Sequence, residues 1–265
     1  MSPTTLKNRK DRPPKRKIPR TPRQRRIPPL KNPQHQRLQR VPRSPARNPV
    51  TAKSGLARAQ RIFERLNEHY PGAKCALDFK NPLQLLIATI LSAQSTDKMV
   101  NTVTPALFRK YRSAQDFAVA LPADLEKQIH SCGFFRSKAR SIQGTSRILV
   151  EKHKGKVPDT MDALLELPGV ARKTANVVLG VAFAKAEGVV VDTHVQRLSR
   201  RLNFSQQTQP EKIERDLMDL FPKKQWILLP HLLIHHGRAL CHARKPECLK
   251  CPIEDLCTSD EKVLA

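Results

Sequence analysis

Four cysteines close to the end of the chain have a spacing that suits a metal site. Cys241, Cys248, Cys251 and Cys257 follow the pattern C-x6-C-x2-C-x5-C within seventeen residues. Four thiolates so close in sequence can close around one centre, and both zinc and iron–sulfur clusters take four cysteine ligands. The spacing predicts a metal site and leaves zinc and iron–sulfur open. The two remaining cysteines are isolated in the sequence, and we expect them to be plain thiols.

A second candidate for chemistry is Lys173, which follows a sharp turn in the segment LELPGVARKTANVVLG, residues 165–180. A short helix is expected to end at Pro168-Gly169, where glycine allows a tight turn, and a new helix begins at once. The free N–H groups at the start of that helix suit a phosphate, and Arg172 and Lys173 add positive charge there. An ordinary corner between two helices with surface cations explains the same pattern, and spacing alone does not decide.

A carboxylate is available in the segment VVDTHVQR, residues 190–197. Near a reacting amine, Asp192 could transfer a proton and stabilise a developing positive charge. Asp192 or Thr193 also stands where a helix N-cap belongs. Local reasoning favours the cap over the catalyst, and the two roles are compatible. We expect His194 to have a structural or polar-contact role.

These three segments resemble the corresponding segments of the endonuclease III family of DNA glycosylase/AP lyases. LPGVARKTANVV resembles the family's helix-hairpin-helix, VDTHVQR resembles its aspartate segment, and the cysteine segment resembles its [4Fe–4S] loop. The resemblance implies that Lys173 is the nucleophile, that Asp192 is the second catalytic residue, and that the four cysteines hold a [4Fe–4S] cluster. The family usually has Gly-Val-Gly where this chain has Gly169-Val170-Ala171. We expect phosphate binding to survive, provided that Ala171 does not need a positive φ.

The same resemblance extends to two segments that would open the duplex. A base inside a stack must be flipped out before chemistry can reach it. The segment LSAQSTD, residues 91–97, resembles the family segment whose glutamine fills the space left behind, which maps to Gln94. The segment GFFRSK, residues 133–138, resembles the loop whose large apolar residue wedges into the stack, here Phe134. Without the resemblance, a polar helix end and core packing explain these two residues equally well.

Cations of the cysteine loop complete the expected DNA surface. Arg244 and Lys245 lie between the first two cysteines, so a structural loop that presents them to DNA is natural. The predicted DNA-binding residues are Gln94, Phe134, Gly169, Ala171, Arg172, Arg244 and Lys245.

Charge points to the same kind of partner. The 265 residues carry a formal charge of +26, which favours a polyanionic partner, nucleic acid ahead of anionic membrane. No stretch approaches about 18 consecutive apolar residues, and the N-terminus has no apolar core that would suit a secretory signal. We therefore expect no membrane partner and a cytoplasmic protein of bacterial type, associated with the nucleoid. In a reducing compartment, cysteines serve as metal ligands or thiols more often than as structural disulfides.

The first fifty residues differ from the rest in composition. They hold 16 of the 49 Lys and Arg, one of the 23 acidic residues and 11 of the 22 prolines. Such a segment cannot bury enough apolar surface to offset its ordering entropy, so residues 1–52 are predicted to be a disordered basic tail. Its role is either a solubilising tail or, as we favour, an arm that tethers the protein to DNA.

The remaining chain is predicted to be all-α, from apolar residues spaced three and four apart. The expected helices run from 54 to about 70 and over 83–91, 99–111, 122–132, 136–153, 159–166, 171–184, 193–202, 209–219 and 223–240; Val189–Val191 is a short strand-like run. The family resemblance covers 54–258. It implies two helical domains with a DNA cleft between them. One is a six-helix domain with the helix-hairpin-helix over 74–185, and the other is an iron–sulfur domain over 53–73 and 186–262.

Together these features predict a bifunctional DNA glycosylase with AP lyase activity in base excision repair. The resemblance implies that it removes oxidised pyrimidines through a lysine Schiff base, and we expect a monomer that binds double-stranded DNA with a damaged base or an abasic site. A pyrimidine-dimer glycosylase of the same superfamily is an alternative. A noncatalytic, metal-stabilised DNA-binding module is an alternative from a different class. An adenine-mismatch glycosylase is disfavoured because it lacks a lysine at position 173 and has a further C-terminal domain.

Overall fold

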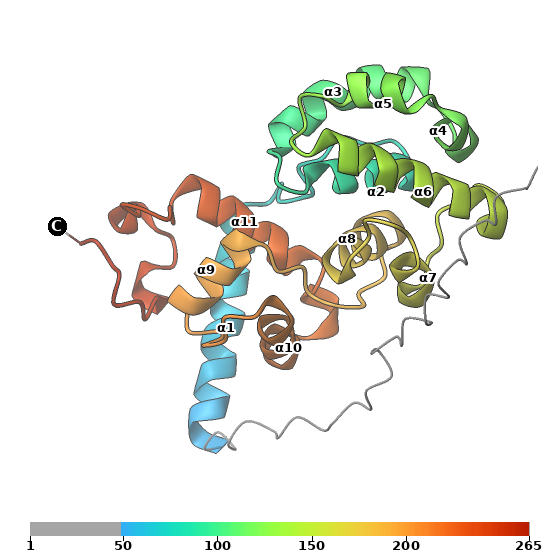
Figure 1. Cartoon of the computed structure of the whole chain (residues 1–265). Coiled ribbons are helices and arrows are strands. Elements are labelled where there is room, and N and C mark those ends of the chain that lie inside the picture. The colour runs from blue at the N-terminus through green and yellow to red at the C-terminus, as the bar shows by residue number, and fades with distance from the viewer. Residues whose placement is uncertain (1–48, 265) are drawn as a thin grey trace, which may run out of the picture. The chain divides into compact units, whose positions relative to one another are not determined.

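A computed structural model describes residues 49–264, with side-chain surroundings for 55–264. Figure 1 shows that the described chain is built from helices, which confirms the all-α prediction, and no β-strand occurs within residues 49–264. The helices are α1 (Pro49–His69), α2 (Pro82–Ser92), α3 (Asp97–Lys110), α4 (Ala114–Val119), α5 (Pro122–Gln128), α6 (Phe135–His153), α7 (Met161–Leu165), α8 (Arg172–Phe183), α9 (Thr193–Arg201), α10 (Pro210–Leu220), η1 (Lys223–Gln225), α11 (Leu228–Ala239), η2 (Cys248–Lys250) and η3 (Glu254–Leu256).

Short polar residues begin several of these helices. Asn81 caps α2 by accepting a hydrogen bond from the N–H of Gln84, and Thr96 caps α3 by accepting one from the N–H of Met99. Each cap satisfies an N–H group that has no partner within its helix. Proline occupies the first turn of α2, α5 and α10, where its missing N–H costs nothing. The helix starts are therefore encoded locally.

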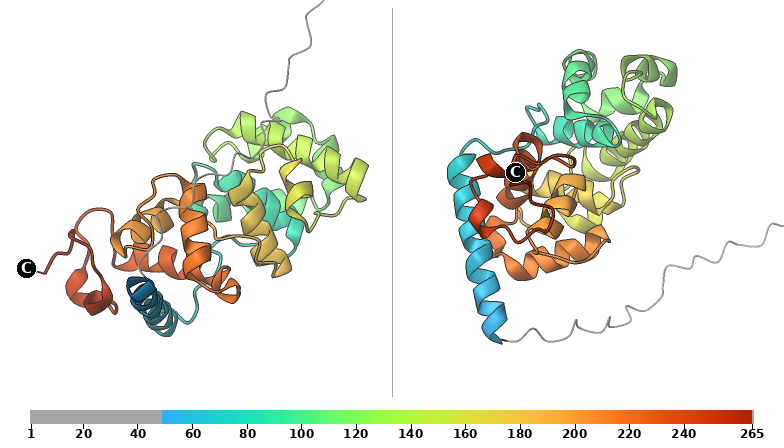
Figure 2. Two further views of the ribbon diagram at one scale, coloured as in Figure 1. Left: turned by 90° about the horizontal axis from the view of Figure 1, so that it is seen from below. Right: turned by 90° about the vertical axis from the view of Figure 1, so that its left-hand side faces the viewer.

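The helices bury two separate hydrophobic cores. The first core takes its buried residues from positions 77 to 179 and is built by α2 to α8. The second takes them from positions 59 to 66 and from 189 to 256, so that α1 packs with α9 to α11. Figures 1 and 2 show these two groups of helices side by side. The domain boundaries stay a prediction, but the cores show that the first helix packs with the end of the chain.

Three local features differ from what the sequence pattern alone indicated. The strand-like run Val189–Val191 forms no strand in the described chain; Val189 and Val191 are buried in the second core instead. The expected helix 223–240 is interrupted: η1 ends at Gln225 and α11 begins at Leu228, with Pro230 in its first turn, where proline is tolerated. Helix α4 was missed because its six residues are too few for a periodic pattern; a capping box of Ser113 and Asp116 specifies it.

The predicted tail needs one adjustment. Helix α1 begins at Pro49, so residues 49–52 are helical and do not belong to a tail. The prediction for residues 1–48 lies outside the described residues. None of the described helices has the length and apolar character needed to cross a membrane.

Candidate active site and cysteine cavity

The turn between α7 and α8 depends on a glycine for two reasons. Gly169 has φ +78°, a left-handed conformation that residues with a side chain rarely adopt. A Cβ atom at Gly169 would also lie only 2.8 Å from the side chain of Ser141 on α6. The Thr145 hydroxyl, on the same helix, donates a 2.8 Å hydrogen bond to the carbonyl of Pro168. The hairpin is therefore seated against α6 with its backbone exposed at the turn.

Alanine is compatible with the hairpin at position 171. Ala171 has φ −94° and ψ 172°, which is extended backbone that any residue adopts. Position 171 therefore does not need a positive φ, and alanine can replace the glycine that the family usually has there. Within the described chain, no side chain caps α8, whose first residue is Arg172. Lys173 follows in the first turn and is exposed. The start of α8 thus presents uncapped N–H groups and a lysine side chain on the surface.

Asp192 is the N-cap of α9. Its Oδ1 accepts hydrogen bonds from the N–H groups of His194 at 2.9 Å and Val195 at 2.8 Å, and its Oδ2 lies 3.1 Å from Nδ1 of His194. The side chain of Asp192 keeps 18% of its surface exposed. The cap predicted from sequence is present, and the carboxylate remains partly accessible. The polar-contact role expected for His194 agrees with this contact.

Three residues predicted to touch DNA line one pocket. Gln94, Phe134 and Gly169 border a hollow of about 220 Å³, together with part of α6. Gln94 and Phe134 both have left-handed backbone, with φ of 54° and 58°. Such strain is uncommon outside glycine and concentrates at functional sites. Phe134 is 69% exposed, which excludes the core-packing explanation for it.

Lys138 is a pocket residue that sequence reasoning missed. It is only 5% exposed, and its Nζ donates a 2.9 Å hydrogen bond to the hydroxyl of Ser95. This contact joins the loop that carries Gln94 to the helix that begins after Phe134. Burial lowers the pKa of Lys138. The signal was available in the sequence, since Lys138 precedes Ala139 and lies four residues before Ile142, on the apolar face of α6.

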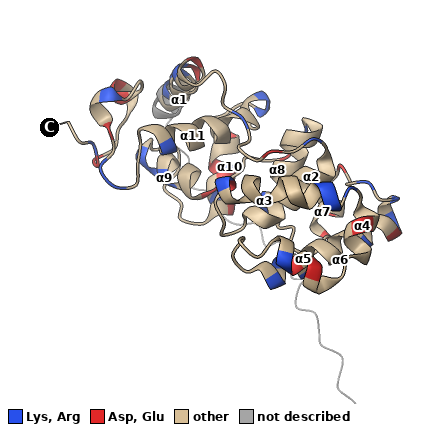
Figure 3. Ribbon diagram, turned by 90° about the horizontal axis from the view of Figure 1, so that it is seen from above, with Lys and Arg blue, Asp and Glu red and all other residues tan. Residues whose placement is uncertain are grey.

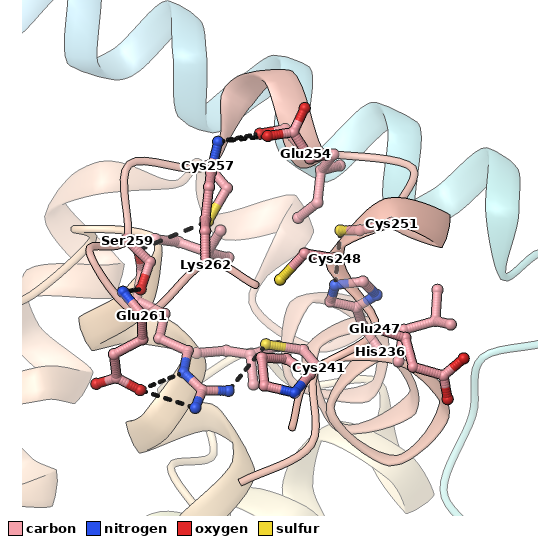
Figure 4. A pocket seen from close by; sticks show the side chains of 16 residues that line it. His236, Cys241, Glu247, Cys248, Cys251, Glu254, Cys257, Ser259, Glu261 and Lys262 are labelled. Atoms are coloured by element: carbon pink, nitrogen blue, oxygen red, sulfur yellow. Dashed lines mark hydrogen bonds and ion pairs between the residues drawn. The ribbon is translucent and has the colours of Figure 1, made fainter. Parts of the chain in front are cut away.

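The four cysteines line one cavity. Figure 4 shows their sulfur atoms arranged around a common hollow, with no disulfide between them. Side chains of the second core, including Leu198 and Ile253, form part of its wall. Within residues 55–264, no group of His, Cys, Asp or Glu is arranged to hold a single metal ion.

The cysteine loop is held by two arginines of α9. Arg201 is 6% exposed; its Nη1 lies 3.3 Å from Sγ of Cys241 and donates a 2.6 Å bond to the carbonyl of His242. Nη2 of Arg197 donates to the carbonyls of Gly237 and Cys241, each at 3.0 Å. Figure 3 shows the basic character of α9. The helix that starts at the Asp192 cap therefore ends against the cysteine loop.

Cys248 and Cys251 have polar neighbours, and all four cysteines of the loop are half-buried. The N–H of Val263 donates to Sγ of Cys248 at 3.4 Å. Nε2 of His236 lies 3.5 Å from Sγ of Cys251, and its Nδ1 lies 3.0 Å from the hydroxyl of Tyr70. Burial raises the pKa of Cys251 to about 11, so a thiolate there needs a cationic partner such as a metal. Burial lowers the pKa of His236 to about 4, which keeps its ring neutral.

The cations predicted to contact DNA fall into two groups. Arg244 and Lys245 are exposed on the loop between Cys241 and Cys248, where backbone and side chains face solvent. Arg172 instead forms an ion pair with Glu214 of α10, at 2.9 Å. Sequence reasoning missed Glu214, although it stands between Ile213 and Leu217 on the buried face of α10.

Comparison with known proteins finds a family model and relatives that cover most of the described chain. The sequence model of one protein family, described as HhH-GPD superfamily base excision DNA repair protein, matches residues 87–223. Endonuclease III of Synechocystis is 54% identical over 76% of this chain and 92% of its own length, and endonuclease III of Escherichia coli K12 is 43% identical over 78% and 98%. A trapped covalent intermediate of an endonuclease III with DNA has a TM-score of 0.73 and 42% identity, covering 77% of this chain and 95% of that one.

The chain belongs to the HhH-GPD superfamily of base excision DNA repair proteins and, within it, to the endonuclease III family. It is therefore an enzyme, a DNA glycosylase/AP lyase of base excision repair. This class leaves no support for the alternative of a noncatalytic binding module.

Proposed function

We propose that the protein removes oxidised pyrimidines from double-stranded DNA and then cuts the strand through a Schiff base on Lys173. The observation that carries the proposal is the exposed lysine in the uncapped first turn of α8, directly after the glycine turn. The amine attacks C1′ of the sugar, the bond from C1′ to the base breaks, and the base leaves with a proton. The C1′–O4′ bond of the sugar then breaks as O4′ takes up the proton that the amine loses, which gives an iminium. The iminium makes the C2′ hydrogen acidic, and loss of that proton drives the β-elimination that breaks the C3′–O bond to the 3′ phosphate.

Asp192 is proposed as the second catalytic residue. A carboxylate stabilises the positive charge that develops on the sugar and can accept a proton from the attacking amine. The capping bonds to the N–H groups of His194 and Val195 support this role because they fix the orientation of the carboxylate. Catalysis and capping are thus two uses of one side chain.

The duplex would be opened from the pocket that Gln94 and Phe134 share. The exposed Phe134 ring is proposed to wedge into the base stack and Gln94 to fill the place of the flipped nucleotide. Uncapped N–H groups of α8 and the Gly169 turn would receive a backbone phosphate, with Ala171 as a backbone donor. Arg244 and Lys245 would add phosphate contacts from the cysteine loop.

The cysteine cavity is proposed to hold a [4Fe–4S] cluster. The support is the donor set of four cysteines around one hollow, the N–H and guanidinium donors to sulfur, and membership of the family. The cluster would cross-link the loop and thereby fix the position of Arg244 and Lys245. Its proposed role is structural.

Trapping with borohydride tests the role of Lys173. Wild-type protein should form a covalent adduct with DNA that contains an oxidised pyrimidine or an abasic site, and Lys173→Gln should form none. Lys212→Gln, which changes an exposed lysine of α10, is the control and should trap normally. Undiminished trapping by Lys173→Gln would remove Lys173 from the mechanism.

A panel of damaged duplexes tests the substrate. We expect release of oxidised pyrimidines, and release of pyrimidine dimers alone would favour a pyrimidine-dimer glycosylase.

The positive charge supports two further proposals, that the protein acts as a monomer on DNA and that it associates with the nucleoid.

A further inference from the structure

Glu214 on α10 is a buried carboxylate that uses both of its oxygens. It is 6% exposed. Its Oε2 accepts a 2.9 Å hydrogen bond from Nε of Arg172, and its Oε1 accepts 3.1 Å and 2.9 Å bonds from Nη2 of Arg172 and Nδ2 of Asn176. The arginine contact is two-pronged, a geometry that fixes orientation as well as distance. Arg172 and Asn176 lie one turn apart on α8, so the carboxylate holds the first turn of that helix.

This contact joins elements of the two hydrophobic cores. Helix α8 contributes Ala175 and Val178 to the first core, and α10 contributes Ile213 and Leu217 to the second. Figure 1 shows α8 and α10 near each other, in the central part of the described structure. Lys173 follows Arg172 directly, so its backbone position depends on the same turn.

The segment that leads to Asp192 passes over the same carboxylate. A Cβ atom at Gly188 would collide with the carboxylate of Glu214 and would lie 2.7 Å from Nδ2 of Asn176. Only glycine leaves room for the backbone to pass so closely. Glu214 therefore contacts the helix that carries Lys173 and, four residues before Asp192, the backbone that carries Asp192.

We propose that Glu214 is a positioning residue: it holds Arg172 and the start of α8 so that the amine of Lys173 faces the same sugar as Asp192. The inference rests on the proposed function of Lys173. Arg172 then acts within the protein, through Glu214, and is not a phosphate ligand. A small misplacement of a reacting group is enough to slow a reaction greatly, which gives such a contact its value.

The test compares Glu214→Gln with Arg172→Gln in the full-length protein. At saturating enzyme, both variants should form the borohydride-trapped adduct at least about tenfold more slowly than wild type. Their affinity for an uncleavable abasic-site duplex should stay within about twofold, and the slope of log K against log salt should not change. The double variant should lose no more rate than either single variant, because the two residues act as one unit.

Asp219→Asn is the matched control, since it makes the same change from carboxylate to amide at an exposed position of α10. It should trap at the wild-type rate. Melting curves and visible absorbance of each variant exclude a general loss of structure. If Glu214→Gln does not fold, Arg172→Lys decides, because it keeps the charge but loses the two-pronged contact.

Two results would overturn the inference. One is a wild-type trapping rate in folded Glu214→Gln or Arg172→Lys. The other is a shallower salt dependence, by about one, in Arg172→Gln alone, which would make Arg172 a phosphate ligand. Both differ from failure of the proposed function, in which wild-type protein itself would form no adduct.

Discussion

The cysteine loop and the hairpin that carries Lys173 differ in the range of the contacts that shape them. The turns that space the cysteines are local, because the N–H groups of Cys251 and Cys257 donate to carbonyls three residues earlier in the chain. Arg197 and Arg201 of α9 then hold the loop as a whole. The start of α8 instead depends on Glu214, 42 residues later. A chelating site can therefore be recognised from spacing within a short segment, whereas a reactive pair is assembled from distant parts of the chain.

Helix α9 connects the two regions. Asp192 caps its first turn, and Arg197 and Arg201 hold the cysteine loop at its other end. A fault in the cysteine loop would thus reach the carboxylate through one short helix. Four predictions test how far the two regions depend on each other.

The largest effect is expected at Asp192. Asp192→Asn should lower the rate of base release by about 10²- to 10⁴-fold, the usual contribution of a proton-transferring group. Its stability should stay close to wild type, because asparagine caps a helix as well as aspartate. Asp192→Ala should lose the activity and also about 1 kcal/mol of stability. Full activity in Asp192→Asn would mean that Asp192 is only a cap.

The next effect concerns the cysteine loop. Wild-type protein should be brown and absorb light at about 400 nm, as expected for a [4Fe–4S] cluster held by four cysteines. Cys251→Ser should lose this absorbance and melt at a lower temperature, by about 2–4 °C for each kcal/mol lost. Cys75→Ala, outside the loop, should keep the colour. Colourless wild-type protein with one zinc per chain would overturn the cluster.

A smaller effect is expected at the pocket. Phe134→Ala should leave stability within about 0.5 kcal/mol, because the ring is exposed. Base release should slow by about tenfold or more, since stacking against a base is worth about 1–3 kcal/mol. A fluorescent base analogue next to the lesion would report base opening. The control, Val119→Ala, alters another exposed apolar residue, on α4, and should leave base opening unchanged.

The smallest effect is expected from the loop cations. Replacing Arg244 and Lys245 together with glutamine should reduce the slope of log K against log salt by about two, because each phosphate contact contributes about 0.9. Release at saturating enzyme should be unchanged. An unaltered slope would show that these cations do not meet phosphate.

The success of the sequence predictions follows the range of the interactions behind them. Most helices and the glycine turn at 169 were predictable because each depends on residues within one or two turns. The strand-like run at Val189–Val191 forms no strand, because a strand needs a partner that the local pattern cannot supply. The break before Leu228 failed because apolar spacing continued across it.

The candidate site divides in the same way. The cysteines, Lys173 and the cap role of Asp192 were predicted from residue type and spacing, with the catalytic roles taken from resemblance. Lys138 and Glu214 were not, although each lies on the apolar face of its helix. A buried charge on such a face needs a partner, and the sequence does not say which one.

An all-α chain, a four-cysteine site, a glycine turn before a lysine and a strongly positive charge can all be read from the residues in order. Those features depend on local sterics, ligand count and composition. The packing of the helices decided that Gln94 and Phe134 share a pocket and that Ala171 keeps a negative φ. It also decided that Glu214 pairs with Arg172. An ion pair between helices, or a shared pocket, forms where helices from distant segments pack, and that packing is set by the cores as a whole.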